Sequence, residues 1–280
     1  MAKNADKPKP AGMKPDVATI LGIVCALGGI VGGLLLEKGQ LIDVAQYTAA
    51  LIVVGGTLGA TLVGTPLPVF FAALGRLKAV FFQRAEDAGG VIEQLIGYAT
   101  KARKNGIVSL ESDAEQIADP FLRKALTLAV DGTDLQDIRN MLELEIAVSE
   151  HRAETEAKVF ESAGGFAPTI GIIGAVMGLI QVMKHLENIQ EVGKGIAVAF
   201  VATIYGVGIA NIFLLPAAAK IKTSIQHESL TKEMIVEGVA GIVEGLNPKV
   251  IRTKLEPYAS HAAKKPAADA AAAAKPAKAA

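Results

Sequence analysis

The sequence is poor in the side chains that most catalytic and metal-binding sites require. Its 280 residues include one cysteine, no tryptophan and four histidines, which are scattered at positions 151, 185, 227 and 261. A single cysteine, Cys25, excludes an intramolecular disulfide. The sequence also lacks a Walker motif, paired Cys or His at metal-ligand spacing, and a Gly-x-Ser-x-Gly motif. These absences argue against an enzyme, a resident metal and nucleotide-driven work.

Charge is missing from four long apolar stretches, although Asp, Glu, Lys and Arg make up 20% of the chain. About 20 apolar residues, rising 1.5 Å each in a helix, cross a bilayer core of about 30 Å. We therefore predict an all-α, polytopic membrane protein with four transmembrane helices and a helical cytoplasmic domain. If this protein handles ions, a partner must supply the ion-binding carboxylate. The stretches are Val17–Leu36, Val44–Gly75, Ala163–Met183 and Gly195–Ala219.

Basic residues flank the predicted spans on one side. Lys14 precedes the first span, Arg76 and Lys78 follow the second, Lys158 precedes the third and Lys220 follows the fourth. The positive-inside rule therefore predicts that both termini and the central region are cytoplasmic. The first apolar run is longer than the roughly 7–15 residues of a signal-peptide core, so we expect a retained span.

Composition divides the chain into six segments. The central region places apolar residues at three- and four-residue spacing, which predicts four or five short helices, one of them starting at Asp119-Pro120. The Ala/Lys/Pro tail has almost nothing to bury, which indicates disorder. The segments are a cytoplasmic extension (1–16), transmembrane helices 1 and 2 (17–75), a cytoplasmic helical domain (76–161), transmembrane helices 3 and 4 (162–219), a cytoplasmic helical segment (220–258) and the tail (259–280).

Small residues and two prolines mark the third and fourth spans. Gly174 and Gly178 are an example of small residues four apart, which recur in every span and let helices approach closely, within one chain or between subunits. Pro168 and Pro216 each remove a backbone donor. Because the two spans run in opposite directions, both prolines are expected near the cytoplasmic face, as a hinge or as a static bend.

Uncharged polar residues also lie in these two spans. Thr203 is mid-span, where a hydroxyl can bond its own backbone or face a polar partner. Periodicity alone leaves both readings open. The polar residues are Thr169, Gln181, Thr203, Tyr205 and Asn211.

Several segments together carry a family resemblance. Gly165–Gly178, followed by Ala202–Gly206 and Pro216, is similar to the third and fourth spans of the MotA family of flagellar motor stator subunits. Arg103–Glu111 resembles the rotor-engaging segment of that family, and Gly238–Leu255 resembles the segment after its fourth span. The resemblance covers roughly residues 17–256.

The resemblance implies a stator subunit of the bacterial inner membrane that converts ion-motive force into torque on the flagellar rotor. It implies a homo-oligomer, a pentameric ring, around a MotB-like single-span partner that supplies an intramembrane aspartate. A cytoplasmic rotor protein and membrane lipid are the other implied partners, and no cofactor or nucleic acid is expected.

The same resemblance assigns roles to individual residues. Ala175 lacks the hydroxyl that some sodium-driven relatives carry, which favours H⁺ over Na⁺ as the transported ion. Gly106 favours a break in the helix within the rotor-engaging segment. The assigned residues are Thr203, Ala175 and Thr169 for the ion pathway, Pro168 and Pro216 for the hinge, and Arg103, Lys104 and Glu111 for the rotor contact.

Three alternatives remain at this stage. A TolQ/ExbB-type energiser shares the last two spans but normally has three spans in all. A channel or transporter acting alone should carry its own intramembrane ionisable or ion-coordinating groups. A membrane scaffold would conduct no ions.

Overall fold

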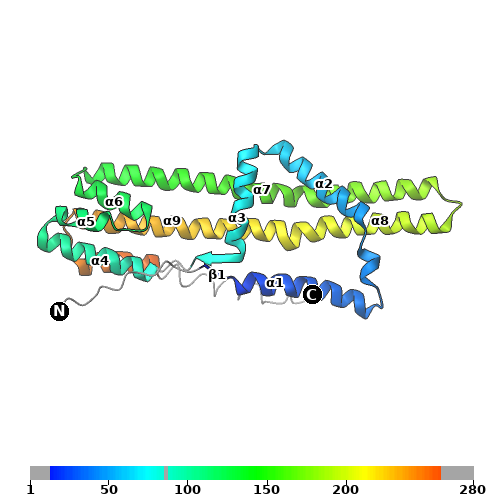
Figure 1. Cartoon of the computed structure of the whole chain (residues 1–280), viewed down its shortest axis with the longest axis horizontal. Helices are drawn as coiled ribbons and strands as arrows, with labels where there is room; N and C mark the ends of the chain where they lie inside the picture. Colours follow the sequence, from blue (N-terminus) through cyan, green and yellow to red (C-terminus); the bar gives the residue numbers. More distant parts are fainter. Residues whose placement is uncertain (1–12, 85–87, 260–280) are drawn as a thin grey trace, which may run out of the picture. The chain divides into compact units, whose positions relative to one another are not determined.

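The computed structural model describes residues 13–84 and 88–259 (Figure 1). Its regular structure is almost entirely helical, which confirms the all-α class. Two three-residue strands, Met13–Pro15 (β1) and Phe82–Arg84 (β2), pair antiparallel. The described residues divide into two compact units: unit one comprises 13–84 with 152–224, and unit two comprises 88–151 with 225–259. Most of the predicted N-terminal extension and nearly all of the predicted tail lie outside the described residues.

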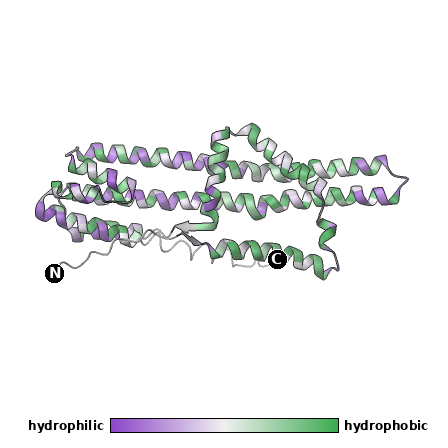
Figure 2. Ribbon diagram, viewed as in Figure 1, coloured by the Kyte–Doolittle hydropathy of each residue, from purple (hydrophilic) through white to green (hydrophobic). Residues whose placement is uncertain are grey.

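Unit one contains the apolar segments. Among the described residues, four helices are long and apolar enough to cross a membrane, which confirms the predicted number of spans. Figure 2 shows hydrophobic residues along α1, α2 and much of α8. The elements are α1 (Val17–Leu36), the 3-10 turn η1 (Leu41–Val44), α2 (Tyr47–Gly64), α3 (Leu67–Phe81), α7 (Leu135–Lys184) from residue 152, α8 (Ile189–Gly208), the π-helix η3 (Ile209–Leu214) and α9 (Leu215–Val243) as far as residue 224.

The N-terminus of α1 is fixed by polar contacts. The Asp16 carboxylate accepts hydrogen bonds from the Ala18 N–H at 3.0 Å and the Thr19 hydroxyl at 2.9 Å, the arrangement of an N-cap. The same carboxylate forms an ion pair with Lys220 of α9. No residue of α1 is buried within the chain, so its apolar surface is left for lipid or for other subunits.

The second apolar stretch is divided into two helices. α2 ends at Gly64 and α3 begins at Leu67. Between them Thr65 has φ −134° and ψ 128°, the extended conformation that a following proline favours. Pro66 also has no N–H with which to continue the ladder of α2. The membrane-length helix therefore covers 47–64 rather than the whole of 44–75.

Unit two has a hydrophobic core of its own. Leu95, Leu126 and Leu142 are fully buried there, together with Met234 and Leu255 from the C-terminal part of the chain. The C-terminal part thus completes the core of the central helices. The elements are α4 (Ala88–Asn105), the 3-10 turn η2 (Ile107–Leu110), α5 (Glu111–Ala114), α6 (Pro120–Val130), α7 up to residue 151, α9 from residue 225 and a helix over 248–259.

The start of α6 follows the sequence prediction. Asp119 caps the helix by accepting from the backbone N–H of Phe121 at 2.8 Å and of Leu122 at 3.0 Å, and Pro120 occupies the first turn. A proline is tolerated there because the first N–H groups of a helix have no intrahelical acceptor. The predicted helix start is confirmed.

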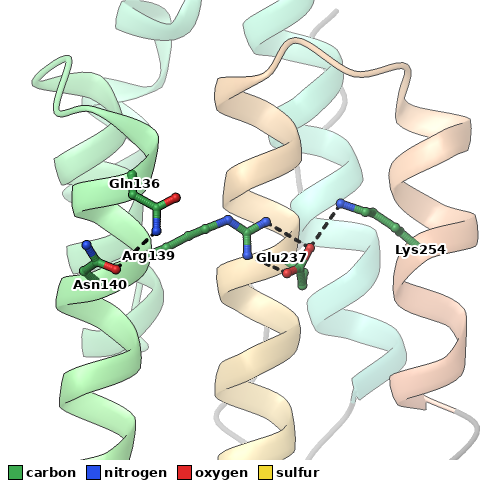
Figure 3. Close-up of polar contacts among 5 residues, drawn as sticks. All are labelled: Gln136, Arg139, Asn140, Glu237 and Lys254. Carbon is green, nitrogen blue, oxygen red and sulfur yellow. Dashed lines mark hydrogen bonds and ion pairs between the residues drawn. The ribbon is translucent and has the colours of Figure 1, made fainter.

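A three-residue ion cluster joins helices of unit two (Figure 3). The Arg139 guanidinium donates to both carboxylate oxygens of Glu237, at 2.6 and 3.2 Å, and Lys254 Nζ donates to the same carboxylate at 3.1 Å. The hydrogen bonds from Arg139 hold the pKa of the Glu237 carboxyl below its ordinary value, although partial burial opposes this. The same contacts raise the pKa of Arg139. The Arg139–Glu237 pair is therefore favoured in its charged form.

Candidate functional site

The backbones of α7 and α8 touch along a seam of small residues. A Cβ added at Gly206 would lie 2.5 Å from the carbonyl oxygen of Ala167, and one added at Gly178 would lie 2.7 Å from that of Gly195. Side chains cannot fit at such distances, so the helices pack as small-residue pairs do in lipid. The seam consists of Ala167, Gly171, Gly174 and Gly178 on α7 and Gly195, Ala199, Ala202 and Gly206 on α8.

The predicted ion-pathway residues lie close to this seam. Thr203 is half-buried, and its Cα would lie 3.5 Å from a Cβ at Gly171. Its hydroxyl donates to the backbone oxygen of Ala199 at 3.2 Å. Ala175 is half-buried and follows seam residue Gly174. The structure therefore places Ala175 on α7 and Thr203 on α8, each next to a point where the two backbones are in contact.

The third candidate is placed differently. Thr169 is exposed on α7, and its hydroxyl donates to the backbone oxygen of Phe166 at 2.7 Å. Both Thr169 and Thr203 thus satisfy their donors within their own helix, which makes a hydroxyl inexpensive in an apolar span.

The two prolines lie at the same level of the helix pair. α7 runs without interruption through Pro168, which cannot donate to the carbonyl of Gly164 one turn earlier. A Cβ at Gly164 would lie 2.6 Å from the side chain of Leu215, the residue before Pro216. The expectation that both prolines share one depth agrees with this contact, whereas their action as a hinge stays a prediction.

The helix before Pro216 is a π-helix, which the sequence did not indicate. Residues 209–214 form η3, and the Leu215 N–H donates to the carbonyl of Ala210, five residues back. Pro216 has no N–H to donate. The wider π-turn before it accommodates the proline, and the helix continues into α9 without a break. π-turns of this kind often occur at functional sites.

Tyr205 is a structural residue that sequence reasoning placed only among the polar residues. Its hydroxyl donates to the carbonyl of Val44 at 2.5 Å and accepts from the Gln46 N–H at 3.3 Å. These bonds fasten the start of α2 to α8. No local pattern could reveal them, because the partners are about 160 residues apart.

Three further ion pairs lie beside the apolar segments of unit one. Glu156 of α7 is 6% exposed and accepts from Arg76 of α3, with Arg152 Nε 3.5 Å away. Lys222 of α9 donates to Glu161 of α7 at 2.6 Å. Such pairs hold neighbouring helices in register, and removal of one partner from the buried Glu156 pair would leave an uncompensated charge.

The predicted rotor-contact residues lie on both sides of a break in unit two. Arg103 and Lys104 occupy the last turn of α4, and Glu111 begins α5. Gly106 between them has φ +81°, so the helix does not continue, as its glycine suggested. All three charged residues are exposed, and none forms an ion pair with a described residue. The break is instead bridged by Lys101 and Asp113, 2.6 Å apart.

The described residues contain no group of three His, Cys, Asp or Glu side chains that could hold a metal ion. The apolar segments of the four membrane-length helices offer hydroxyl, amide and backbone oxygens but no carboxylate. Such a surface can hydrogen-bond to a titrating carboxyl group but cannot replace it.

Comparison with known proteins gives consistent matches over most of the chain. The model of the MotA/TolQ/ExbB proton channel family matches residues 113–234, and that of the Motility protein A N-terminal region matches residues 20–106. Motility protein A of Helicobacter pylori is 36% identical over 243 residues, which cover 87% of this chain and 95% of that protein.

Solved structures match as well. A chain of the C. jejuni MotAB structure is 33% identical with a TM-score of 0.83, over 87% of this chain and 95% of that one. A chain of the flagellar MotAB stator complex from Bacillus subtilis is 32% identical with a TM-score of 0.80, over 86% and 95%.

Proposed function

The chain belongs to the MotA/TolQ/ExbB proton channel family and is a stator subunit of the flagellar motor, and we propose that it works as a pentameric ring around a MotB-like partner. It is a multi-pass inner-membrane protein and not an enzyme. Two similar solved structures are MotAB complexes, which supports the partner. The match to the Motility protein A N-terminal region favours the stator over a three-span energiser.

The titrating group of the ion pathway comes from the partner in this proposal. The apolar segments of this chain have no Asp, Glu, Lys, Arg or His. An aspartate at the centre of a membrane helix costs about 2.5–3.5 kcal/mol on insertion scales, so it must face protein or water. Thr203 supplies a hydroxyl mid-span, beside the seam, and its position is the observation that carries the proposal. Ala175 and Thr169 belong to the same pathway.

The ion is H⁺ in this proposal. Ala175 offers no side-chain oxygen, whereas a desolvated Na⁺ needs several oxygen ligands. A proton needs only a titratable group and hydrogen-bonding neighbours.

Protonation of the partner carboxylate would change which ring subunit it prefers, and Pro168 and Pro216 would let the helix pair follow that change. The close approach of Gly164 to Leu215 supports a shared level for the two prolines. Segments 17–75 and 162–219 lie in the membrane, segments 76–161 and 220–258 are cytoplasmic, and so are both termini.

Arg103, Lys104 and Glu111 engage the cytoplasmic rotor protein. Their exposure and their lack of ion pairs with described residues support this role, since paired charges would first have to be separated. Opposite charges on either side of Gly106 suit a partner that carries both signs. The Lys101–Asp113 pair keeps the two sides in place.

A pair of isosteric substitutions tests the ion pathway. T203V should abolish or strongly reduce motor rotation, measured in cells that lack their own stator and supply the partner, with normal membrane levels. T61V is the matched control, because the Thr61 hydroxyl also donates to its own helix, to Thr57 O at 2.7 Å, but is buried on α2. Equal rotation of T203V and T61V would remove Thr203 from the pathway.

Charge reversals test the rotor contact. R103E or E111K should reduce swimming while leaving the stator in the membrane, because neither charge forms an ion pair within the described chain. E233K reverses another exposed charge of unit two and should swim normally. Full swimming of both R103E and E111K would exclude these residues from the torque interface.

A further inference from the structure

Asn211 is a polar side chain exposed in the fourth apolar segment. It lies in η3, within a run from Gly195 to Ala219 that has no Asp, Glu, Lys, Arg or His. A carboxamide that faced lipid would carry a desolvation cost, so polar residues in membrane helices usually face protein or a water-filled space. The exposed side of Asn211 therefore indicates a surface that is not covered by lipid alone.

The orientation of the carboxamide is fixed by the helix itself. Its Nδ2 donates to the backbone oxygen of Val207 at 2.9 Å. A carbonyl oxygen can only accept, so the amide nitrogen must occupy this position and Oδ1 lies on the other side of the group. No described residue donates to Oδ1. Asn211 thus presents an acceptor away from its own helix.

Asn211 lies on the same side of the rod as Thr203. The two residues are eight apart with Val207 between them at four, and residues four apart are neighbours on one helix face. The Thr203 hydroxyl also gives its proton to its own backbone, at Ala199. Both side chains therefore present acceptor oxygens along one face.

The π-helix adds acceptors at the same level. In a π-helix the N–H of residue 216 would donate to the carbonyl of Asn211, and in an α-helix it would donate to that of Ile212. Pro216 has no N–H, so it donates to neither. Backbone oxygens next to a proline in a membrane helix are commonly satisfied by water or a neighbouring side chain.

The spacing suits a pathway that leads from mid-span to the charged end of the helix. Lys220, paired with Asp16, follows Asn211 by nine residues, and Thr203 precedes it by eight. At about 1.5 Å per residue, Asn211 divides a gap of roughly 25 Å into two steps of about 12 Å and about 13.5 Å. Without it, the interval between Thr203 and Lys220 would contain only apolar side chains on this helix, apart from Tyr205, which is engaged with Val44 and Gln46.

We propose that Asn211 is a second polar residue of the ion pathway, which holds water through Oδ1 on the cytoplasmic exit from Thr203. This inference rests on the proposed function, because it needs an ion to leave the partner carboxylate. The carboxamide does not titrate. It accepts a hydrogen bond from water that receives the proton, and it keeps the exit wetted.

An isosteric pair of variants tests this role. The side chains introduced by N211V and N211T have the same shape, but only threonine retains an acceptor oxygen. Rotation is measured at low load, where ion transfer limits speed, in cells that supply the partner. N211T should rotate about fivefold faster than N211V, the effect of one hydrogen bond in a rate-limiting step. Torque near stall and recruitment of the stator to the motor should differ little between the two.

Two comparisons separate this inference from its premise. Q181L removes another exposed carboxamide from the third span and should keep wild-type speed. Equal speeds of N211V and N211T, including no rotation in either, would overturn the role of Asn211, as would an equal loss in Q181L. If T203V rotates like T61V, the proposed pathway itself fails. If only T203V is slow, the pathway stands and Asn211 has no part in it.

Discussion

The seam predicts that one methyl group on Gly206 weakens the protein. The added Cβ would lie 2.5 Å from the carbonyl oxygen of Ala167 and 3.1 Å from the Cα of Gly171, whereas ordinary contact begins at 3.4 Å. The helix pair must therefore part locally by about 0.9 Å, which also forfeits part of the dispersion energy of the neighbouring contacts. Overpacking of this kind costs about 1–3 kcal/mol. The better helix propensity of alanine returns about 0.5–1 kcal/mol.

G206A should accordingly lower the free energy of unfolding by about 1 kcal/mol, the difference between the middles of these two ranges. The measurement is thermal unfolding of the purified stator complex in detergent, followed by the loss of helical circular dichroism. G208A is the control two residues away, where a Cβ meets nothing within 4 Å, so its melting temperature should stay the same or rise. A G206A protein that melts at or above the wild-type temperature would refute backbone contact at the seam.

Two further predictions concern contacts that hold each unit together. E237Q should destabilise unit two by about 2 kcal/mol near neutral pH, because Arg139 and Lys254 lose their carboxylate, whereas E233Q should not. Folding lowers the pKa of Glu237, so the stability that this carboxylate contributes is present above the ordinary pKa of 4.5 and is lost as pH falls through the folded-state pKa. The melting temperature of the wild type should therefore fall more steeply with acid than that of E237Q. Equal pH dependence of the two melting temperatures would contradict this prediction. Y205F should leave the Val44 carbonyl and the Gln46 N–H without their partner, at about 1–3 kcal/mol, and expose the connection before α2 to protease. Tyr47 is 87% exposed, so Y47F should behave as wild type, and equal protection of both variants would argue against the Tyr205 anchor.

Hydropathy and local helix-start and helix-stop signals were sufficient to predict part of this structure. The four spans, the start of α6 at Asp119 and the end of α4 before Gly106 depend on residues close in sequence, and each was predictable. Small-residue pairs were ambiguous. Gly174 and Gly178 lie in the seam, but a Cβ at Gly28 or Gly32 would meet nothing within 4 Å. The spacing of small residues therefore shows that another helix can pack closely there, but it does not identify that helix.

Long-range partners could not be predicted in this way. The Arg76–Glu156 and Asp16–Lys220 pairs join residues 80 or more positions apart, and any of many charged residues could have been the partner.

The π-helix before Pro216 could not be predicted for another reason. A proline indicates that a backbone donor is missing, but whether the helix bends, breaks or widens depends on how the neighbouring helix packs.

The short polar groups beside the seam also explain why this chain can dispense with a carboxylate. In the proposed ring, the subunits would outnumber the partner carboxylates, so most subunits would lack that carboxylate at any moment. A charged side chain waiting in such a subunit would cost about 2.5–3.5 kcal/mol. Thr203 and Asn211 avoid this cost, since each donates to its own helix, to Ala199 and Val207, when nothing else is near. Each can still accept from water or a protonated group that arrives. Hydroxyl and carboxamide groups that donate to their own helix and keep an acceptor oxygen would therefore suit the proposed ring of identical subunits, in which the partner carries the titrating charge.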